Sequence, residues 1–317
     1  MNSRAVVIDR PETLAVRELG LDAPGDMDLV VDIRFSGIST GTERLLYDGR
    51  MPHFPGLAYP LVPGYESVGV VSDAGAGAAE WIGRTVFVPG SRGFVGAHGL
   101  FGGAASRVVV PAARVTPIGD DLGERGVLLA LAATAHHALH PQGSDSAPVL
   151  PDLIVGHGVV GRLVARLCLA LGGSGPRVWE HETRRRTDHE GYTVCDPADD
   201  ETTGYVCVVD ASGDAAVVDS IVPKLAHGGE VVLAGFYPGR VGFAFAPAFM
   251  REARIRIAAE WQPSDMASTL RLVERGLLSL DGLISHRHGA GDAATAYRAA
   301  FEDPESIKTI LDWRAVQ

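Results

Sequence analysis

Hydrophobic and polar positions follow two different patterns along the chain. Up to about Arg114, short apolar runs such as AVVI, LVVDIRFSG and RTVFVPG are separated by glycine and proline. Short runs bounded by turn residues are typical of β-strands. The pattern therefore predicts a compact, mainly β domain at residues 1–125.

From about Gly126 the pattern changes to alternating strands and helices. GVLLALAATAHHALH has apolar residues at helical spacing, and the runs LIVG, RVWE, YVCVVDASG and GEVVLAGF follow it. Strands that alternate with helices predict a parallel sheet covered on both faces. We expect an α/β domain at residues 126–261, and then helices at MASTLRLVERG and DAATAYRAAFEDP and a strand at IKTILDW within residues 262–317.

The segment VGHGVVGRL contains the motif GxGxxG between a predicted strand and a predicted helix. Gly156 permits a tight turn, Gly158 lets a pyrophosphate approach the backbone, and Gly161 allows the helix to pack closely. Val159 and Val160 begin the helix, whose free N–H groups attract an anion. The motif alone also fits a turn without a ligand, but this context predicts a dinucleotide site in a Rossmann doubly wound sheet.

Glu180 bears on the choice of dinucleotide. It ends the predicted strand RVWE, 24 residues after Gly156, where an acidic side chain accepts hydrogen bonds from the adenine ribose. A carboxylate there repels a 2′-phosphate, which favours NAD. The run Arg184 to Arg186 could neutralise that phosphate, so NADP stays an alternative.

Composition and charge exclude several classes of partner. The 28 basic and 39 acidic residues give a formal net charge of −11, which argues against nucleic acid. No apolar run is long enough to span a bilayer, and MNSRAVVIDRPE lacks the apolar core of a signal peptide. The three cysteines form no CxxC pair, so we expect a cytoplasmic protein with packed thiols.

Taken together, the glycine-rich β domain, GxGxxG, VVDASG and GGEVVLAGF resemble the medium-chain dehydrogenase/reductase superfamily over essentially the whole chain. The resemblance implies an α/β fold in which a Rossmann domain is inserted into a GroES-like β-rich substrate domain, to which residues 262–317 return. It also implies that the reaction takes place between the two domains. The further cofactor-binding residues that it implies are Asp210, Ser212, Gly213, Gly235, Phe236 and Lys308. Strand ends, turns and a solvated lysine are the alternative interpretation.

The positions that hold zinc in metal-dependent members carry no suitable donors. Thr40 stands at the first ligand position, Tyr65 at the second, and the third falls near Ala130. A tetrahedral zinc needs sulfur, imidazole or carboxylate donors, so we expect no metal. By family position Thr42 is the hydroxyl that relays the substrate proton, although such residues also commonly satisfy turns.

Thr42, Tyr65 and His98 are the candidate catalytic residues, because each could accept or relay the alcohol proton. His98 titrates in the useful range, but a histidine in a glycine-rich loop is more often an ordinary surface residue. It could alternatively contact a magnesium ion of the substrate.

Within the superfamily, SGISTGTERLLYDG, PGYESVG, GLFGGAAS and the segment from LISHRHG to the end resemble the hydroxyethyl-bacteriochlorophyllide dehydrogenases. This resemblance implies NAD-dependent oxidation of a secondary alcohol on a bacteriochlorophyllide-type tetrapyrrole. A zinc-free NADPH-dependent quinone or enoyl reductase and a non-catalytic pigment carrier are the alternatives. The oligomeric state is left open, with a homodimer as one option.

Overall fold

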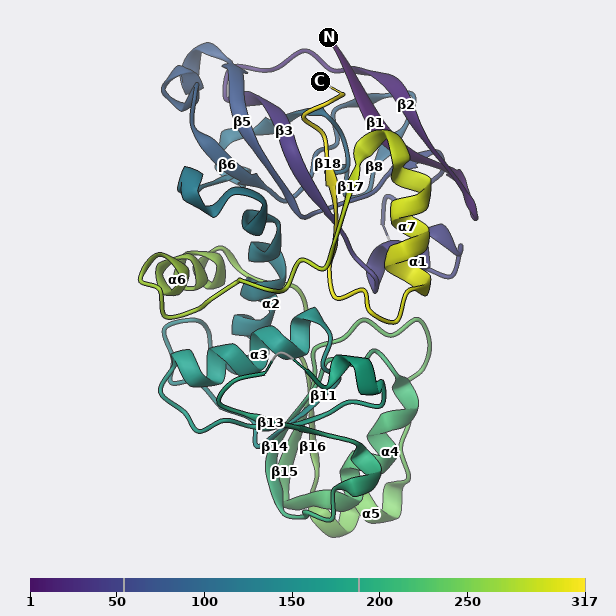
Figure 1. Ribbon diagram of the computed structural model, residues 1–317, viewed down its shortest axis with the longest axis vertical. Helices are drawn as coiled ribbons and strands as arrows, with labels where there is room; N and C mark the ends of the chain where they lie inside the picture. The colour runs from purple at the N-terminus through teal and green to yellow at the C-terminus, as the bar shows by residue number, and fades with distance from the viewer. Residues whose placement is uncertain (54, 188, 317) are drawn as a thin grey trace. The chain divides into compact units, whose positions relative to one another are not determined.

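The computed structural model describes residues 1–53, 55–187 and 189–316. It contains two compact units, of which unit 1 comprises residues 1–130 and 283–317 and unit 2 comprises residues 131–282 (Figure 1). The sequence analysis placed these boundaries at residues 125 and 261. In the structure, the first boundary follows Ala130 and falls inside helix α2 (Leu129–Leu139). The second follows Gly282, so helix α6 (Pro263–Glu274) belongs to unit 2.

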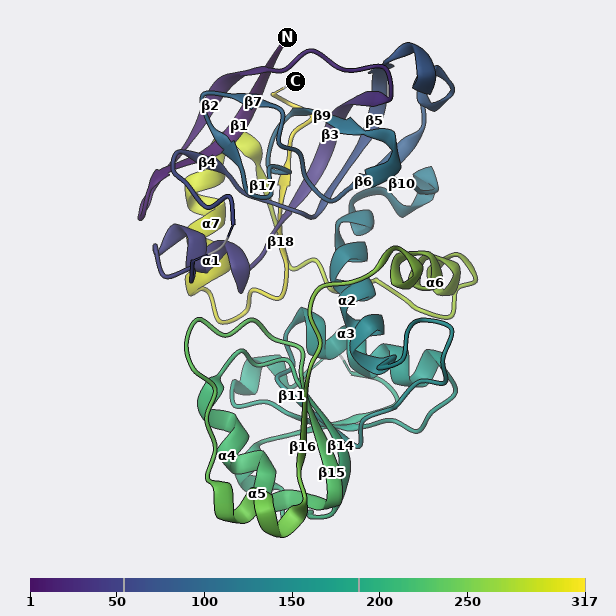
Figure 2. The same cartoon turned by 180° about the vertical axis from the view of Figure 1, so that it is seen from behind.

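Unit 1 is built from two sheets, as the short apolar runs predict. A five-stranded sheet has the order β7-β2-β1-β4-β8, and a seven-stranded sheet has the order β10-β6-β5-β3-β18-β17, with β9 also paired to β3 (Figure 2). Most of their buried apolar side chains form one core that includes Val6, Ile33 and Val86, each fully buried, and Ile8 and Leu61 belong to a second, smaller cluster. The strands are β1 Asn2–Arg10, β2 Thr13–Leu21, β3 Asp28–Ile38, β4 Leu61–Val62, β5 Ser67–Ala74, β6 Thr85–Val88, β7 Phe94–Val95, β8 His98–Gly99, β9 Arg107–Pro111, β10 Thr116–Pro117, β17 His286–Gly289 and β18 Thr309–Asp312.

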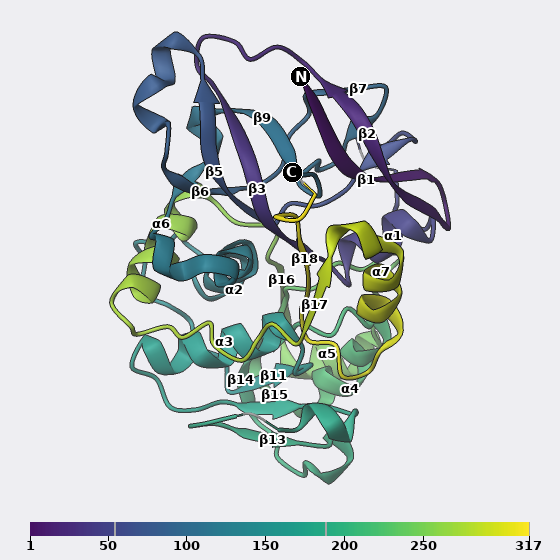
Figure 3. The ribbon, with the colours of Figure 1, turned by 45° about the horizontal axis from the view of Figure 1, so that its top comes forward.

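The carboxy-terminal segment returns to unit 1, as the family resemblance implies. Strand β18 pairs antiparallel with β3, and β17 pairs parallel with β18. Trp313 follows β18, is fully buried and donates from Nε1 to Ser36 Oγ at 2.8 Å. Helices α1 (Thr42–Tyr47) and α7 (Ala293–Glu302) lie beside the β1–β2 hairpin (Figure 3), where the rings of Tyr47 and Phe301 are 5.8 Å apart.

Unit 2 contains a six-stranded sheet whose paired strands all run parallel, in the order β13-β12-β11-β14-β15-β16. Strands β12 and β13 follow on one side of β11 within the sheet, and β14, β15 and β16 follow on its other side. The connecting helices therefore cover both faces, with α3 on one face and α4 and α5 on the other (Figures 1 and 2). The elements are β11 Leu153–Val155, α3 Val159–Ala170, β12 Arg177–Trp179, β13 Thr193–Cys195, β14 Tyr205–Asp210, α4 Val218–Ile221, β15 Leu225–Leu233, α5 Phe245–Arg251 and β16 Arg254–Ile257.

The predicted fold class is therefore confirmed: a Rossmann doubly wound sheet accompanies a GroES-like β-rich unit. No helix among residues 1–53, 55–187 and 189–316 combines the length and the apolar character needed to cross a bilayer.

Candidate active site

The glycine motif forms the turn between β11 and α3. Gly156 has φ +93°, which favours glycine, and a Cβ at Gly161 would lie 1.8 Å from Gly156 O, so the helix packs on the turn only without a side chain there. A Cβ at Gly158 would meet no atom within 4 Å. The open side at Gly158 and the uncapped first turn of α3 therefore fit a pyrophosphate.

The turn after β14 lies next to this motif, and the turn after β15 lies next to the turn after β14. A Cβ at Gly156 would approach Ser212 Cα to 3.1 Å, and one at Gly235 would approach Gly213 N to 3.1 Å. The structure thus gathers four of the predicted cofactor residues at the carboxyl ends of β11, β14 and β15. In open parallel sheets this edge, where the strand order reverses, is where nucleotides bind.

Asp210 lies beneath this edge. Its carboxylate is fully buried and accepts from Ser212 N, Ser212 Oγ and Tyr237 Oη at 2.7–2.8 Å. Burial raises the pKa of Asp210, against these donors. Asp210 therefore fixes the turn that carries Ser212, and direct contact with a cofactor stays a prediction. Phe236, by contrast, is 44% exposed.

Glu180 follows β12 and is half-buried. Its Oε2 accepts from His157 N at 2.9 Å and its Oε1 accepts from Glu182 N at 2.9 Å. Each oxygen keeps a lone pair for a further donor, such as a ribose hydroxyl. Arg186 donates to Glu180 O at 2.8 Å and also pairs with Asp196.

His157 and Arg162 stabilise the glycine turn through buried hydrogen bonds. His157 is fully buried between Arg185 O and Tyr192 Oη, and burial lowers its pKa to about 4. Arg162 donates to His157 O at 3.1 Å and to Arg185 O at 3.1 Å. The sequence analysis did not single out these two residues; their position inside and just after GxGxxG is the signal that points to them.

In unit 1, three side chains form what we call the hydroxyl cluster: Ser39, Thr42 and Tyr65. Tyr65 Oη donates to Ser39 Oγ at 2.9 Å, Thr42 N donates to the same oxygen at 3.4 Å, and the Thr42 side chain lies near enough to Tyr65 to lower the pKa of its phenol. Thr42 begins α1, so this segment, read from sequence as a loop, contains a short helix. Burial raises the pKa of Tyr65, with a contribution from the charge of Glu66. The phenol is therefore neutral at physiological pH.

His98 is not part of the hydroxyl cluster. It lies on β8, paired in register with Leu61, and its ring is exposed. Its backbone N donates to Pro60 O at 2.9 Å. A catalytic role for His98 therefore stays a prediction from its residue type.

Lys308 is buried within unit 1. Its Nζ donates to Glu66 Oε2 at 2.6 Å and to Ile38 O at 3.1 Å, and the residue is 1% exposed. The family resemblance assigned this ammonium to the pyrophosphate. The structure shows it holding β3, β5 and β18 together, and a contact with the cofactor stays a prediction.

Comparisons with known proteins agree with this geometry. Residues 25–120 match the alcohol dehydrogenase GroES-like domain family. The chain is 54% identical to the 2-desacetyl-2-hydroxyethyl bacteriochlorophyllide A dehydrogenase of Rhodobacter capsulatus and 53% identical to that of Cereibacter sphaeroides, each over 99% of both chains. The chain belongs to the medium-chain dehydrogenase/reductase superfamily.

As a medium-chain dehydrogenase, it is an oxidoreductase, and solved structures share its fold. An alcohol dehydrogenase from Escherichia coli in complex with NADH has a TM-score of 0.82 at 18% identity and covers 98% of this chain and 99% of its own. The 2R,3R-butanediol dehydrogenase of Bacillus subtilis gives the same TM-score, identity and coverage.

The residues at the superfamily's catalytic zinc positions do not fit zinc. Thr40 is exposed, the Tyr65 phenol is neutral and hydrogen-bonded, and Ala130 offers no donor. Glu66, which follows Tyr65 in the chain, already binds the ammonium of Lys308. Within the described part of the chain, no group of three or more His, Cys, Asp or Glu side chains is placed to hold a metal ion.

Two buried residues beside the hydroxyl cluster were missed as functional candidates. Glu43 is fully buried in α1, and Tyr297 of α7 donates to Glu43 Oε2 at 2.5 Å. An acidic residue placed directly after the hydroxyl-rich run was the available signal for Glu43. Nothing local marks Tyr297, because 254 residues separate the pair.

Proposed function

We propose that this chain oxidises the 3-(1-hydroxyethyl) group of a bacteriochlorophyllide to a 3-acetyl group in bacteriochlorophyll biosynthesis, with NAD as hydride acceptor and without catalytic zinc. The observation that carries the substrate assignment is full-length identity of 53–54% to two proteins named as dehydrogenases of this pigment. The structural support for a metal-free reaction is that Thr40, Tyr65 and Ala130, at the superfamily's zinc positions, offer no suitable donors, while the Tyr65 phenol is hydrogen-bonded within the hydroxyl cluster.

The chemistry of this substrate makes a metal-free oxidation feasible. The carbinol carbon is attached to an aromatic macrocycle, and the ketone that forms is conjugated with it, which lowers the barrier from the substrate side. The protein then has to orient the reacting carbon and accept one proton. Bound NAD would supply the hydride acceptor, while Thr42 and Tyr65 would hold the alcohol oxygen and its proton.

Support for NAD comes from Glu180. Its carboxylate is fixed by two backbone N–H groups at the end of β12, where it can accept from ribose hydroxyls and would repel a 2′-phosphate. Among structures of this fold, the Escherichia coli dehydrogenase holds NADH and one from Sinorhizobium meliloti holds NADP. The fold therefore leaves the choice to side chains such as Glu180 and Arg186.

The experiment is an oxidation assay on protein whose metal content has been measured. Mixing protein, NAD and the hydroxyethyl pigment should shift the pigment's long-wavelength band as the conjugated carbonyl forms, and should produce one NADH per ketone. Activity should survive chelator and should show a higher kcat/KM with NAD than with NADP. Loss of activity with chelator, or stoichiometric bound zinc, would contradict the metal-free assignment.

The same assay separates the two rival functions. A quinone or enoyl reductase would require NADPH and would reduce simple conjugated carbonyl compounds. A pigment carrier would bind the pigment and leave its spectrum unchanged.

A further inference from the structure

Unit 1 buries an unusual set of ionisable groups behind the hydroxyl cluster. We call Glu43, Glu66, Tyr297 and Lys308 the acid cluster. All four are at most 2% exposed, and they come from α1, the segment before β5, α7 and the segment before β18. Two carboxylates face one ammonium, so full ionisation would leave one uncompensated negative charge in the interior.

The two carboxylates are not equivalent. Glu66 Oε2 lies 2.6 Å from the ammonium of Lys308, whereas Glu43 contacts only neutral donors: Ser39 N at 3.2 Å and Tyr297 Oη at 2.5 Å. Burial raises the pKa of Glu43 to about 7; the Tyr297 hydrogen bond opposes this, and the charge of Glu66 adds to it. Burial raises the pKa of Glu66 as well, but the ammonium of Lys308 opposes that shift by direct contact. Glu43 has no cation in contact, so we expect it to be the member that gains or loses a proton near neutral pH.

Ser39 connects Glu43 to the hydroxyl cluster. Its backbone N donates to Glu43 Oε1, while its Oγ accepts from Tyr65 Oη at 2.9 Å. Thr42 N donates to Ser39 Oγ at 3.4 Å, and the Thr42 side chain lies near enough to Tyr65 to lower the pKa of that phenol. Ser39 contacts Glu43 through its backbone N, and its Oγ faces Tyr65. The path from Thr42 to the buried carboxylate is therefore complete only when the Ser39 side chain turns about χ1 and brings Oγ to Glu43 Oε1.

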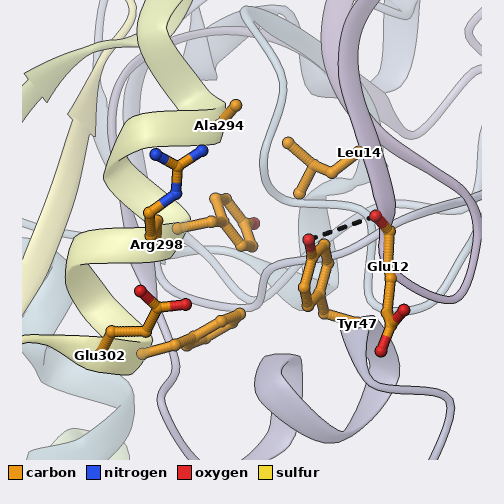
Figure 4. A pocket seen from close by; sticks show the side chains of 8 residues that line it. Glu12, Leu14, Tyr47, Ala294, Arg298 and Glu302 are labelled. Atoms are coloured by element: carbon orange, nitrogen blue, oxygen red, sulfur yellow. Dashed lines mark hydrogen bonds between the residues drawn. The ribbon is translucent and has the colours of Figure 1, made fainter.

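Tyr297 connects Glu43 to the other side of unit 1. It lines a pocket of about 130 Å³ together with Glu12, Leu14, Tyr47, Ala294, Arg298, Phe301 and Glu302. Figure 4 shows that Arg298 and Glu302 of α7 face the β1–β2 hairpin across this pocket, where Tyr47 Oη donates to Glu12 O at 3.2 Å. A pocket lined by charged side chains admits water, so Tyr297 lies between Glu43 and a route to solvent.

We propose that Glu43 receives the proton of the substrate alcohol through the hydroxyl cluster and that Tyr297 passes it to the pocket. The inference rests on the proposed function and adds the residue that finally takes the proton. Thr42 accepts the alcohol proton while its own moves to Tyr65, that of Tyr65 moves to Ser39, and that of Ser39 moves to Glu43. The carbinol C–H leaves as hydride to nicotinamide, so each turnover gives one ketone, one NADH and one neutral Glu43. Tyr297 passes its proton to water in the pocket as Glu43 returns one to it, so no tyrosinate forms; burial and the neighbouring carboxylates hold the pKa of Tyr297 well above its ordinary value.

The test measures kcat against pH for the full-length protein with NAD and the hydroxyethyl pigment. Wild type should become faster with rising pH through about 7, because only ionised Glu43 accepts the proton. Glu43→Gln keeps the shape and the hydrogen bonds but cannot accept a proton. We expect it to lower kcat at least tenfold and to abolish the pH-dependent limb, with the Kd for NAD unchanged.

Tyr297→Phe gives a second, independent reading. It removes a hydrogen bond that lowers the pKa of Glu43. The pH at which kcat rises should therefore move upward, and a purely structural role of Tyr297 would not cause this shift. The matched control is Tyr205→Phe, which removes another buried phenol that donates to a carboxylate, Asp200, at 2.5 Å in unit 2. It should leave the pH profile unchanged.

Two failures can be told apart. Inactivity of the wild type on the pigment refutes the proposed function and, with it, this proton path. An active wild type whose pH limb persists in Glu43→Gln, or does not move in Tyr297→Phe, overturns the proton path and leaves the proposed function standing.

Discussion

Replacing Glu43 with glutamine should stabilise unit 1 at neutral and alkaline pH, although it removes a buried hydrogen-bonded residue. The pKa of Glu43 rises from 4.5 to about 7 because burial favours its neutral form. The folded protein therefore binds the proton more tightly than the unfolded chain, and stability falls as pH rises from 4.5 to about 7. At about 1.4 kcal/mol per pKa unit, the ionised carboxylate costs about 3 kcal/mol above pH 7.

Glutamine avoids this cost because it stays neutral. Its Oε1 can accept from Ser39 N, and its amide can donate to Tyr297 Oη, so both contacts of Glu43 are retained. We expect Glu43→Gln to be more stable than wild type by about 3 kcal/mol at pH 8 and nearly equal to it below pH 4.5.

The assay is urea unfolding across this pH range, read by hydrogen exchange in peptides from β3 and β18, which report on unit 1. Glu124→Gln is the control, because this carboxylate of unit 1 is partly exposed and pairs with Arg287 at the surface. Its effect should stay within about 1 kcal/mol at every pH. A stability difference for Glu43→Gln that did not grow from pH 4.5 to 7 would refute the reasoning.

Three further substitutions test other parts of the structure. Gly158→Val fills the open side of the glycine turn and should raise the Kd for NAD about 100-fold (~3 kcal/mol), measured by calorimetry, with the unfolding midpoint unchanged. Glu180→Ser removes the ribose acceptor and the repulsion of a 2′-phosphate, so the ratio of kcat/KM for NAD to that for NADP should fall at least tenfold; an unchanged ratio would reject Glu180 as the selector. Lys308→Met strands Glu66 without its cation and should cost about 3–5 kcal/mol in denaturant unfolding, and adding Glu66→Gln should recover much of that loss.

The nucleotide-binding unit could be predicted well because its signals are local. GxGxxG, the strand before it and the helix after it lie within one short segment, and the steric limit at Gly161 is set by its near neighbour Gly156. The contact of Ser212 with this turn, and of Gly235 with Gly213, follows from parallel strands ending at one edge. The domain boundaries are less marked in the sequence, because α2 continues through Ala130 without a break.

The acid cluster could not be predicted in the same way, because its contacts are long-range. Glu43 and Tyr297 are 254 residues apart, and Glu66 and Lys308 are 242 apart. A lysine in IKTIL reads from sequence as a surface residue or as a cofactor ligand. Only the pairing of β18 with β3 brings its ammonium to Glu66.

The hydroxyl cluster and the acid cluster answer one chemical requirement between them. A zinc ion stabilises an alkoxide by its charge, so the alcohol can lose its proton before the hydride leaves. Hydroxyls carry no such charge, and Tyr65 has a pKa raised by burial, so they can only hand the proton onward as the hydride departs. Such a site needs a group beyond the hydroxyls whose pKa is near neutral pH. It also needs a route by which that group loses its proton before the next turnover. In the proposed path Glu43 would take the proton and Tyr297 would pass it on, which would explain why a chain with threonine and tyrosine at the zinc positions also buries a second carboxylate that contacts no cation.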